Sequence, residues 1–234
     1  MAEIPLVLVP GLLCTEELWR AQLPALAPVA EVRVAHEQTE HDTIAGMARA
    51  ILDAAPPRFA LAGLSMGGIV AFEIMRAAPG RVTRLALLDT LAHAAAGAEE
   101  AAVRQGRMDM AARGRFREVV GLQLARFIPG PRLADRALVD RIIAMCETVG
   151  PEAYARQERA VLARADSRGS LGAIACPTLV LCGRQDAATP LAWSELIAAG
   201  VPGAKLVVVE DCGHLSTMEQ PEPVNRALAA WLAA

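Results

Sequence analysis

The segment FALAGLSMGGIVAFEIM, residues 59–75, joins a short apolar run to a helix-like apolar stretch through a serine flanked by glycines. The run before the serine is typical of a buried strand, and the stretch after it is typical of a helix. GLSMG at residues 63–67 is therefore a G-x-S-x-G pattern at a strand-to-helix turn. Only small residues suit the two glycine positions if the chain there passes close to neighbouring backbone. We infer that this turn presents the Ser65 hydroxyl at the carboxyl end of a sheet.

Strand-like runs on both sides of this segment predict the rest of the sheet. Short β-rich apolar runs alternate with helix-like segments, a pattern typical of βα units that build a parallel sheet covered on both faces. The expected strands are residues 4–9, 31–35, 59–63, 85–89, 178–181 and 205–209. The expected helices are residues 16–26, a segment after Asp42 and Thr43, a segment from Ser65 to about Pro79, and a segment from about Glu222 onward. The fold class is thus α/β, with a doubly wound, mostly parallel six-stranded sheet.

Between residues 91 and 172 the pattern changes to helical periodicity, with arginine-rich faces and no strand-like run. Apolar positions recur three or four residues apart, and glycine and proline separate the runs. We interpret residues 91–172 as a helical cap insertion and residues 1–90 and 173–234 as the core domain. Because no repeat, low-complexity tract or flexible linker separates the two parts, the cap is expected to pack on the core as one unit.

The composition excludes several classes of protein. A chain of 234 residues that is 54% hydrophobic suits one folded domain, with or without an insertion, and not a disordered tail. Its 23 basic and 26 acidic residues form no long like-charge run, which argues against a nucleic-acid partner. The uncharged stretches near residues 59–72 and 169–183 are interrupted and too short to span a membrane. No secretory signal is recognisable, so the sequence predicts a cytoplasmic location.

The five cysteines are an odd number with no C-x-x-C spacing, and several lie in apolar runs. We expect buried free thiols, because disulfides are rare in the cytoplasm and a free cysteine packs as a small apolar residue. The cysteine pattern therefore indicates no metal site.

A serine hydroxyl is a weak nucleophile at its free pKa, so a catalytic Ser65 needs a histidine base and an acid that orients it. His214 is the candidate base, because it follows the β-run KLVVVEDCG in a loop at the expected carboxyl edge of the sheet. The other histidines lie in polar stretches or at the start of the insertion and are expected to be solvated: His36, His41 and His93.

Two aspartates at strand ends compete for the role of the acid. Asp186 follows the strand TLVLCG in the loop GRQD, and Asp89 ends the strand LALLD. We favour Asp186, because its loop lies between the nucleophile and the histidine in the chain order Ser, Asp, His. Asp89 is then expected to cap the entry to the insertion, and Asp211 to brace the loop that carries His214.

Two backbone N–H groups are the candidates for an oxyanion hole. The Met66 N–H lies at the start of a helix, where partial positive charge favours an oxyanion. The loop VPGLLC, residues 9–14, would supply the Leu12 N–H, since Pro10 has no N–H to donate. Together they would stabilise the tetrahedral intermediate of acyl transfer.

The VPG loop, GLSMGG, GRQD and DCGHLS together resemble the α/β-hydrolase superfamily in order and spacing, over nearly the whole chain. The pattern is similar to that of the small capped members, which include carboxylesterases, enol-lactonases, C–C bond hydrolases and cofactor-free haloperoxidase-like enzymes. The mechanism that the resemblance implies requires neither a metal nor an organic cofactor. It implies a nucleophile, a general base, an orienting acid and two oxyanion donors at Ser65, His214, Asp186, Leu12 and Met66.

The chain departs from the family pattern in two places. Many relatives carry His-Gly where this chain has Pro10-Gly11, so a side-chain hydrogen bond that would support the oxyanion loop is absent. Many relatives also begin with an antiparallel strand pair, whereas only three residues precede the first strand here, so six parallel strands are expected. Serine at position 65 excludes the members with an aspartate nucleophile, which are the dehalogenases and epoxide hydrolases.

The sequence predicts a monomeric or homodimeric serine hydrolase that cleaves small, mostly apolar carboxylic esters through an acyl-enzyme. An enol-lactone hydrolase for an anionic lactone is the enzymatic alternative, and a non-catalytic ligand-binding protein of the same fold is the alternative from another class. A substrate carboxylate would have six candidate partners in the insertion, which otherwise form a solvated face: Arg104, Arg107, Arg113, Arg115, Arg117 and Arg126. The expected pocket residues are Leu13, Met66, Met108, Phe127, Met145 and Leu215.

Overall fold

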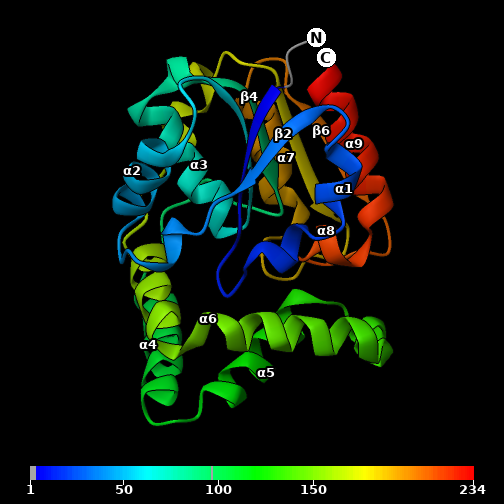
Figure 1. Cartoon of the computed structure of the whole chain (residues 1–234). Helices are drawn as coiled ribbons and strands as arrows, with labels where there is room; N and C mark the ends of the chain where they lie inside the picture. The colour runs from blue at the N-terminus through cyan, green and yellow to red at the C-terminus, as the bar shows by residue number, and fades with distance from the viewer. Residues whose placement is uncertain (1–3, 96) are drawn as a thin grey trace.

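One sheet of six strands forms the centre of the computed structural model, which describes residues 4–95 and 97–234 (Figure 1). The strand order is β2-β1-β3-β4-β5-β6, and every neighbouring pair is parallel. The strands are β1 (Ile4–Val9), β2 (Ala30–Val34), β3 (Phe59–Leu64), β4 (Val82–Leu88), β5 (Thr178–Gly183) and β6 (Lys205–Val209). The expected doubly wound sheet of six parallel strands is confirmed.

The bounds of β4 differ most from the expectation of residues 85–89. The strand begins three residues earlier, at Val82. These first residues pair with β3 across a bulge, since Phe59 pairs with Val82 and Ala60 pairs with Arg84. The apolar pattern did not reveal these polar residues as strand. At the other end, Asp89 lies outside the strand and has a φ of 45°.

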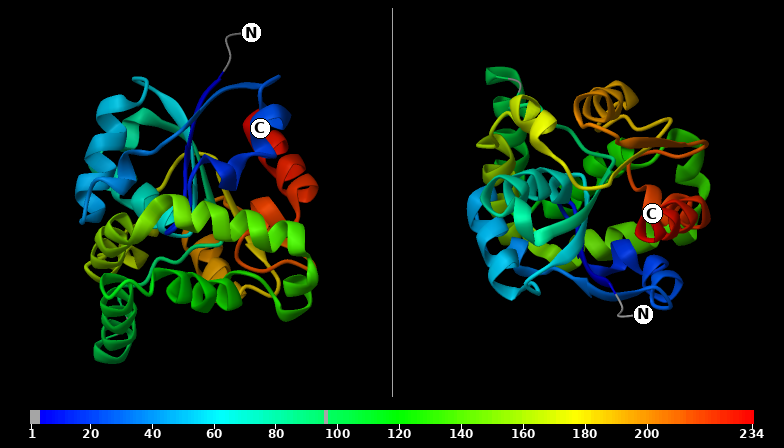
Figure 2. Two further views of the ribbon diagram at one scale, coloured as in Figure 1. Left: turned by 60° about the horizontal axis from the view of Figure 1, so that its bottom comes forward. Right: turned by 90° about the horizontal axis from the view of Figure 1, so that it is seen from above.

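Helices cover both faces of the sheet. In Figures 1 and 2, α1 and α9 lie together on one face, whereas α2, α3 and α7 lie on the other. The α-helices of this part are α1 (Gln22–Leu26), α2 (Ile44–Ala54), α3 (Met66–Ala77), α7 (Leu191–Gly200), α8 (Ser216–Glu219) and α9 (Pro221–Ala233). The short 3-10 helices are η1 (Glu16–Trp19), η2 (Glu37–Thr39), η3 (Pro79–Arg81), η4 (Gly130–Ala134) and η5 (Arg168–Ala173).

The prediction of a single first helix over residues 16–26 is wrong, because the structure has the two separate helices η1 and α1 in its place. Pro24 has no N–H to donate to the carbonyl group of Arg20, so a continuous helix is interrupted there. The helix expected after Thr43 begins as predicted, with the Thr43 hydroxyl accepting a hydrogen bond from the Gly46 N–H at 3.0 Å.

Between β4 and β5 the described residues form helices and no strand, namely α4 (Ala98–Ala112), α5 (Phe116–Phe127) and α6 (Arg136–Leu162). We refer to these three as the helical layer. It lies beyond the carboxyl ends of the strands, at the bottom of Figure 1, and Figure 2 shows it from two other directions. The α6 helix bends at Gly150, where a φ of 78° precedes Pro151. The division into a core and a cap of residues 91–172 stays a prediction.

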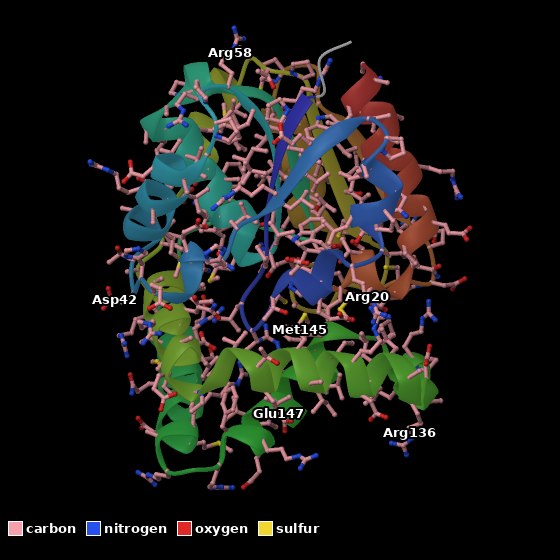
Figure 3. All side chains as sticks on the ribbon, in the orientation of Figure 1. Arg20, Asp42, Arg58, Arg136, Met145 and Glu147 are labelled. Atoms are coloured by element: carbon pink, nitrogen blue, oxygen red, sulfur yellow. The ribbon has the colours of Figure 1, made fainter. Side chains whose placement is uncertain are left out.

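Through α6, the helical layer packs on loops that follow β1 and β2 at the carboxyl edge of the sheet. Figure 3 shows Met145 on the side of α6 that faces the sheet and Glu147 on the opposite side. Met145 is accordingly 2% exposed and belongs to one apolar core that also contains apolar residues of β1, β3 and β4. Among the described residues, no helix combines the length and apolarity needed to cross a bilayer. All five cysteines are free and four of them are buried, as expected.

Candidate active site

Ser65 lies at the turn between β3 and α3 and has a backbone conformation that residues other than glycine rarely adopt. Its φ is 56° and its ψ is −116°. Two hydrogen bonds hold this conformation: the Ser65 N–H donates to the Leu88 carbonyl at 2.9 Å, and the Thr90 hydroxyl donates to the Ser65 carbonyl at 2.7 Å. The end of β4 therefore fixes the position of the serine.

The two glycines of the G-x-S-x-G pattern are required by close backbone contacts. A Cβ atom on Gly63 would lie 2.3 Å from the carbonyl oxygen of Gly67, and one on Gly67 would lie 2.1 Å from that of Val9. Any side chain at these positions would force the turn away from β1 and α3. Steric contacts therefore explain the two glycines of the G-x-S-x-G pattern.

The structure brings Ser65, His214 and Asp186 together from three distant loops. His214 Nε2 lies 2.8 Å from Ser65 Oγ, and His214 Nδ1 lies 2.8 Å from Asp186 Oδ2. With the proton on Nδ1, the ring donates to the carboxylate and accepts from the serine hydroxyl. This arrangement can deprotonate the hydroxyl when it attacks an electrophilic carbon.

Asp186 is held by the loop that follows it. Its Oδ1 accepts hydrogen bonds of 2.8 Å from the N–H groups of Ala188 and Thr189, and its Oδ2 accepts one of 2.6 Å from the Thr189 hydroxyl. Sequence reasoning missed Thr189, although a threonine three residues after an aspartate at a strand end is the available signal. Thr189 therefore orients the carboxylate that faces the imidazole.

The electrostatics of the pair favour an ionised carboxylate beside a basic imidazole. Burial acts to lower the pKa of His214, but the Asp186 carboxylate, its hydrogen bond and the nearby Asp89 outweigh burial and raise that pKa. Burial acts to raise the pKa of Asp186, but His214 and Thr189 outweigh it and lower that pKa. The site therefore stabilises the imidazolium that forms when His214 takes a proton.

Asp89, the second candidate for the acid, has a different position and partners. Its Oδ1 accepts a hydrogen bond of 2.8 Å from the Gly183 N–H, and its Oδ2 accepts one from the Ser216 hydroxyl. It does not cap the entry to the insertion, which corrects the expectation, because its fully buried side chain turns toward β5 and α8. Burial and then repulsion from Asp186 raise its pKa. Asp89 thus ties together the loops that carry Asp186 and His214.

Glu219, and not Asp211, braces the loop of His214. The Glu219 carboxylate accepts hydrogen bonds from the N–H groups of Gly213 at 3.0 Å and Leu215 at 3.1 Å. Asp211 is exposed, with a φ of 51°, which corrects the sequence expectation. The physical reason is that the short helix α8 turns Glu219 back under the loop, and no local pattern in the sequence signals this contact.

The candidate oxyanion donors lie beside the serine. Leu12, Met66, Ser65 and His214 line one small cavity of about 60 Å³. The backbone after Leu12 has a φ of 61° at Leu13, whose N–H donates to Gln157 Oε1 at 2.9 Å. Gln157 belongs to α6 and is completely buried, so the helical layer supplies the side-chain support that the sequence suggested was missing from this loop. Sequence reasoning missed Gln157 because the two partners lie 144 residues apart.

The residues that line the pocket differ in part from those expected. A larger cavity of about 640 Å³ adjoins the small one and shares with it Leu91, Arg104, Arg126 and Ala188. Of the expected residues, Met66 and Phe127 line the small cavity. The other four line neither cavity, because their side chains are packed into the apolar core: Leu13, Met108, Met145 and Leu215.

The arginines of the helical layer divide into two groups. Arg104, Arg107 and Arg126 line the larger cavity, which corrects the expectation of a solvated face for these three. The other three are exposed, as expected: Arg113, Arg115 and Arg117. His93 also lines the larger cavity, where its ring lies 5.3 Å from the ring of Trp193, so it is not simply solvated.

A metal ion has one candidate group among the described residues, formed by Asp89, Cys182 and Asp186, whose ligand atoms lie within 4.8 Å of one another. The carboxylate oxygens of both aspartates already accept hydrogen bonds from N–H and O–H groups of the protein. Burial, followed by repulsion from the two carboxylates, raises the pKa of the Cys182 thiol, which disfavours the thiolate that binds metals. The residues present therefore do not fit a metal.

A family model described as the Alpha/beta hydrolase family matches residues 6–227. A pimeloyl-[acyl-carrier protein] methyl ester esterase from Aromatoleum aromaticum is 29% identical, over 93% of this chain and 93% of its own length. The 3-oxoadipate enol-lactonase 2 from Acinetobacter baylyi is 29% identical, over 74% of this chain and 64% of its own. A solved hydrolase structure from Pseudomonas aeruginosa PA01 is 31% identical, covers 100% of this chain and 92% of that one, and has a TM-score of 0.86.

Proposed function

This chain belongs to the alpha/beta hydrolase family, and we propose that it is a serine hydrolase that cleaves small carboxylic esters with Ser65, His214 and Asp186. The observation that carries the proposal is the continuous set of contacts from Asp186 through His214 to Ser65, with both distances at 2.8 Å. The likeness to a methyl ester esterase over 93% of both chains supports the choice of an ester as substrate.

In the first step the Ser65 oxygen attacks the ester carbonyl carbon while His214 Nε2 takes the hydroxyl proton. Asp186 keeps Nδ1 protonated and stabilises the imidazolium, and for this reason it raises the pKa of His214. The Leu12 and Met66 N–H groups would bind the oxyanion of the tetrahedral intermediate, because both residues line the cavity that contains Ser65 Oγ. His214 then returns the proton to the leaving alcohol, which leaves an acyl group on Ser65.

In the second step water cleaves the acyl-enzyme. His214, neutral again, takes a proton from the water as it attacks the acyl carbon, and returns that proton to the Ser65 oxygen as the acid departs. The helical layer covers this site as a cap, and a cavity of about 60 Å³ around Ser65 leaves room for the reacting groups, with the rest of the substrate in the larger cavity. Both steps use the side chains of Ser65, His214 and Asp186, the two backbone N–H groups and one water molecule.

A fluorophosphonate probe tests the proposed nucleophile directly. We expect wild-type protein to be labelled stoichiometrically and Ser65→Ala to be unlabelled while it retains the wild-type melting temperature. Ser170→Ala, a hydroxyl outside both cavities beside Ser65, is the matched control and should be labelled as fully as wild type. Labelling of Ser65→Ala would place the nucleophile elsewhere. An absence of labelling in wild type, with a ligand still raising its melting temperature, would favour a non-catalytic binding protein.

Enol-lactone hydrolysis is the second candidate, because a lactone is a cyclic ester that the same residues can open. The enol-lactonase relative and the arginines beside the site favour it. A panel that pairs short p-nitrophenyl esters with an enol-lactone bearing a carboxylate separates the two candidates by kcat/KM. A higher kcat/KM for the esters supports the first candidate, and a higher value for the lactone supports the second.

A further inference from the structure

Two arginines beside the candidate site have no partner of opposite charge in the part of the chain that the structure describes. Arg107 of α4 and Arg126 of α5 line the larger cavity. Among residues 4–95 and 97–234, neither side chain forms a hydrogen bond or an ion pair, and Nη1 of Arg107 is buried without any partner. Burying an unopposed guanidinium costs free energy, so such a pair indicates a missing anion.

The other arginines of the cavity wall are already paired. Arg104 contacts Glu100 at 2.8 Å and also pairs with the completely buried Glu158. Arg164 contacts the same Glu100 at 3.1 Å, and Arg168 pairs with Asp166, which also lines the cavity. The acidic groups near Arg107 and Arg126 therefore serve other guanidinium groups. Glu99, the remaining acid of the wall, lies exposed near the start of α4.

The two unpaired guanidinium groups act on each other and on the site. Partial burial, then repulsion from Arg107 and Arg104, lowers the pKa of Arg126, which identifies these three as a cluster of like charges. Arg126 also lines the small cavity with Ser65 and His214. An anionic group held by Arg126 would therefore belong to the molecule whose carbonyl group lies at Ser65.

We propose that Arg107 and Arg126 bind a carboxylate of the substrate, so that the protein hydrolyses esters or lactones that carry a free carboxylate in preference to neutral ones. This inference rests on the function proposed above. A carboxylate suits the planar guanidinium group, which donates two parallel hydrogen bonds to it. Glu99 and Glu100 on the same wall disfavour a doubly charged phosphate.

Matched pairs of esters test the preference, because each pair differs only by a carboxylate in place of a methyl group. On the acyl side, monomethyl succinate, adipate and suberate are paired with methyl butanoate, hexanoate and octanoate. On the alcohol side, 4-acetoxybutanoate is paired with butyl acetate. We expect wild type to show a higher kcat/KM for the charged member on one side of the ester bond. Equal or lower values for the charged members on both sides would overturn the proposal.

Variants assign the preference to the two arginines. Arg107→Gln and Arg126→Gln should each lower kcat/KM for the preferred charged ester by about tenfold to a hundredfold, as expected for losing a hydrogen-bonded charge contact. Their kcat/KM for the neutral member should fall much less, so that the ratio of the charged to the neutral value falls in both variants. Arg113→Gln removes the same charge from an exposed position at the end of α4 and should leave both values unchanged. An equal loss on charged and neutral esters, or an equal loss in Arg113→Gln, would overturn the assignment.

A binding measurement separates this inference from the proposed function. Adipate should raise the melting temperature of Ser65→Ala, and it should raise that of Ser65→Ala/Arg126→Gln much less. If the wild type neither reacts with a fluorophosphonate nor cleaves any ester, the proposed function fails, and the melting temperatures still decide whether the arginines bind a carboxylate. If the wild type cleaves neutral esters and adipate has no effect on either variant, the inference alone fails.

Discussion

Residues of the sheet are packed more tightly than residues of the helical layer. Every residue of β3 and β5 is buried, whereas only Met108 and Ala111 of the helix α4 are buried. A Cβ atom on Gly183 at the end of β5 would lie 2.0 Å from the Gly213 carbonyl oxygen, whereas Cβ atoms on Gly106 and Gly121 of the helical layer would meet nothing within 4 Å. The groups proposed to react are thus set in close-packed backbone, and those proposed to recognise the substrate lie on looser helices.

The two regions meet at the groups proposed to react. The backbone N–H of His214 donates a hydrogen bond of 2.8 Å to the carbonyl group of Phe127, at the end of α5. Gln157 of α6 holds the loop of Leu12. The helical layer therefore does more than cover the site, because it also fixes two of the loops that the proposed mechanism uses. Five predictions test how far this division of roles extends.

The largest expected effect is in the sheet region, at Asp186. We expect Asp186→Asn to lower kcat on the best ester by about 10⁴-fold, because the amide cannot hold the imidazole in the required tautomer or stabilise its charge. Asp89→Asn is the control, since an asparagine oxygen can still accept from the Gly183 N–H, and its loss should be far smaller. A greater loss in Asp89→Asn would reverse the assignment of the acid.

The pH dependence of wild type and Asp186→Asn tests whether the Asp186 carboxylate raises the pKa of His214. His214 must be neutral to take a proton, so kcat/KM of wild type should fall about tenfold per pH unit below the pKa of His214. That pKa is raised, so the fall should begin above the ordinary histidine value of about 6.5. In Asp186→Asn the carboxylate is lost and burial remains, so the fall should move to lower pH. A profile that is flat from about pH 5 to 8 in wild type would contradict the role of His214.

The next effect concerns stability and tests the tight packing of the sheet region. Gly67→Ala should lower the free energy of unfolding by about 3 kcal/mol or more, because the new methyl group meets the Val9 carbonyl oxygen at 2.1 Å. Urea denaturation followed by circular dichroism measures this change. Gly80→Ala, with nothing within 4 Å of the added carbon, is the matched control. A loss below about 1 kcal/mol would mean that the turn adapts more easily than its contacts indicate.

A smaller effect is expected where the helical layer supports the oxyanion loop. Gln157→Leu leaves the buried Leu13 N–H without an acceptor, which costs about 1–3 kcal/mol, or a factor of about 10 to 100 if the cost falls on catalysis. We expect kcat to fall and KM to change little. Gln157→Glu retains an oxygen acceptor and should restore most of kcat. A variant that loses only melting temperature, with kcat unchanged, would limit Gln157 to a structural role.

The smallest expected effect is in the helical layer. Gly121 is exposed in the middle of α5, so Gly121→Ala should stabilise the protein by about 0.5–1 kcal/mol, because alanine restricts the unfolded chain without any clash. Differential scanning calorimetry should show a melting temperature higher by about 1–4 °C. A lower melting temperature would show that α5 is more closely packed there than the structure indicates.

The parts of the site that could be predicted from sequence are those set by local backbone sterics. Ser65 was identified because its two flanking glycines are required by contacts between adjacent elements. His214 and Asp186 follow strands of the same sheet, and carboxyl ends of parallel strands share one edge. Glu219 was missed because its hydrogen bonds depend on the turn of a four-residue helix.

The orientation of the helical layer could not be predicted. Periodicity showed that α4 and α5 are helices with basic faces, and that pattern is the same whether a face meets solvent or a cavity. Arg107 and Arg113 lie six residues apart on the same stretch, yet the former lines the cavity and the latter is exposed. The rotation of each helix about its own axis depends on what it packs against, and α6 supplies those contacts.

Local sequence patterns predicted the parallel sheet, the turn at Ser65 and the chain order of the proposed nucleophile, acid and base, because hydrophobic period and backbone sterics act over a few neighbouring residues. Among the described residues, packing between distant segments places Asp186 against His214, Gln157 against the loop of Leu12, and Arg107 and Arg126 beside the site without an acidic partner. Those outcomes depend on contacts between residues far apart in the chain, and the free energy of each such contact is defined only once the packing has placed both partners.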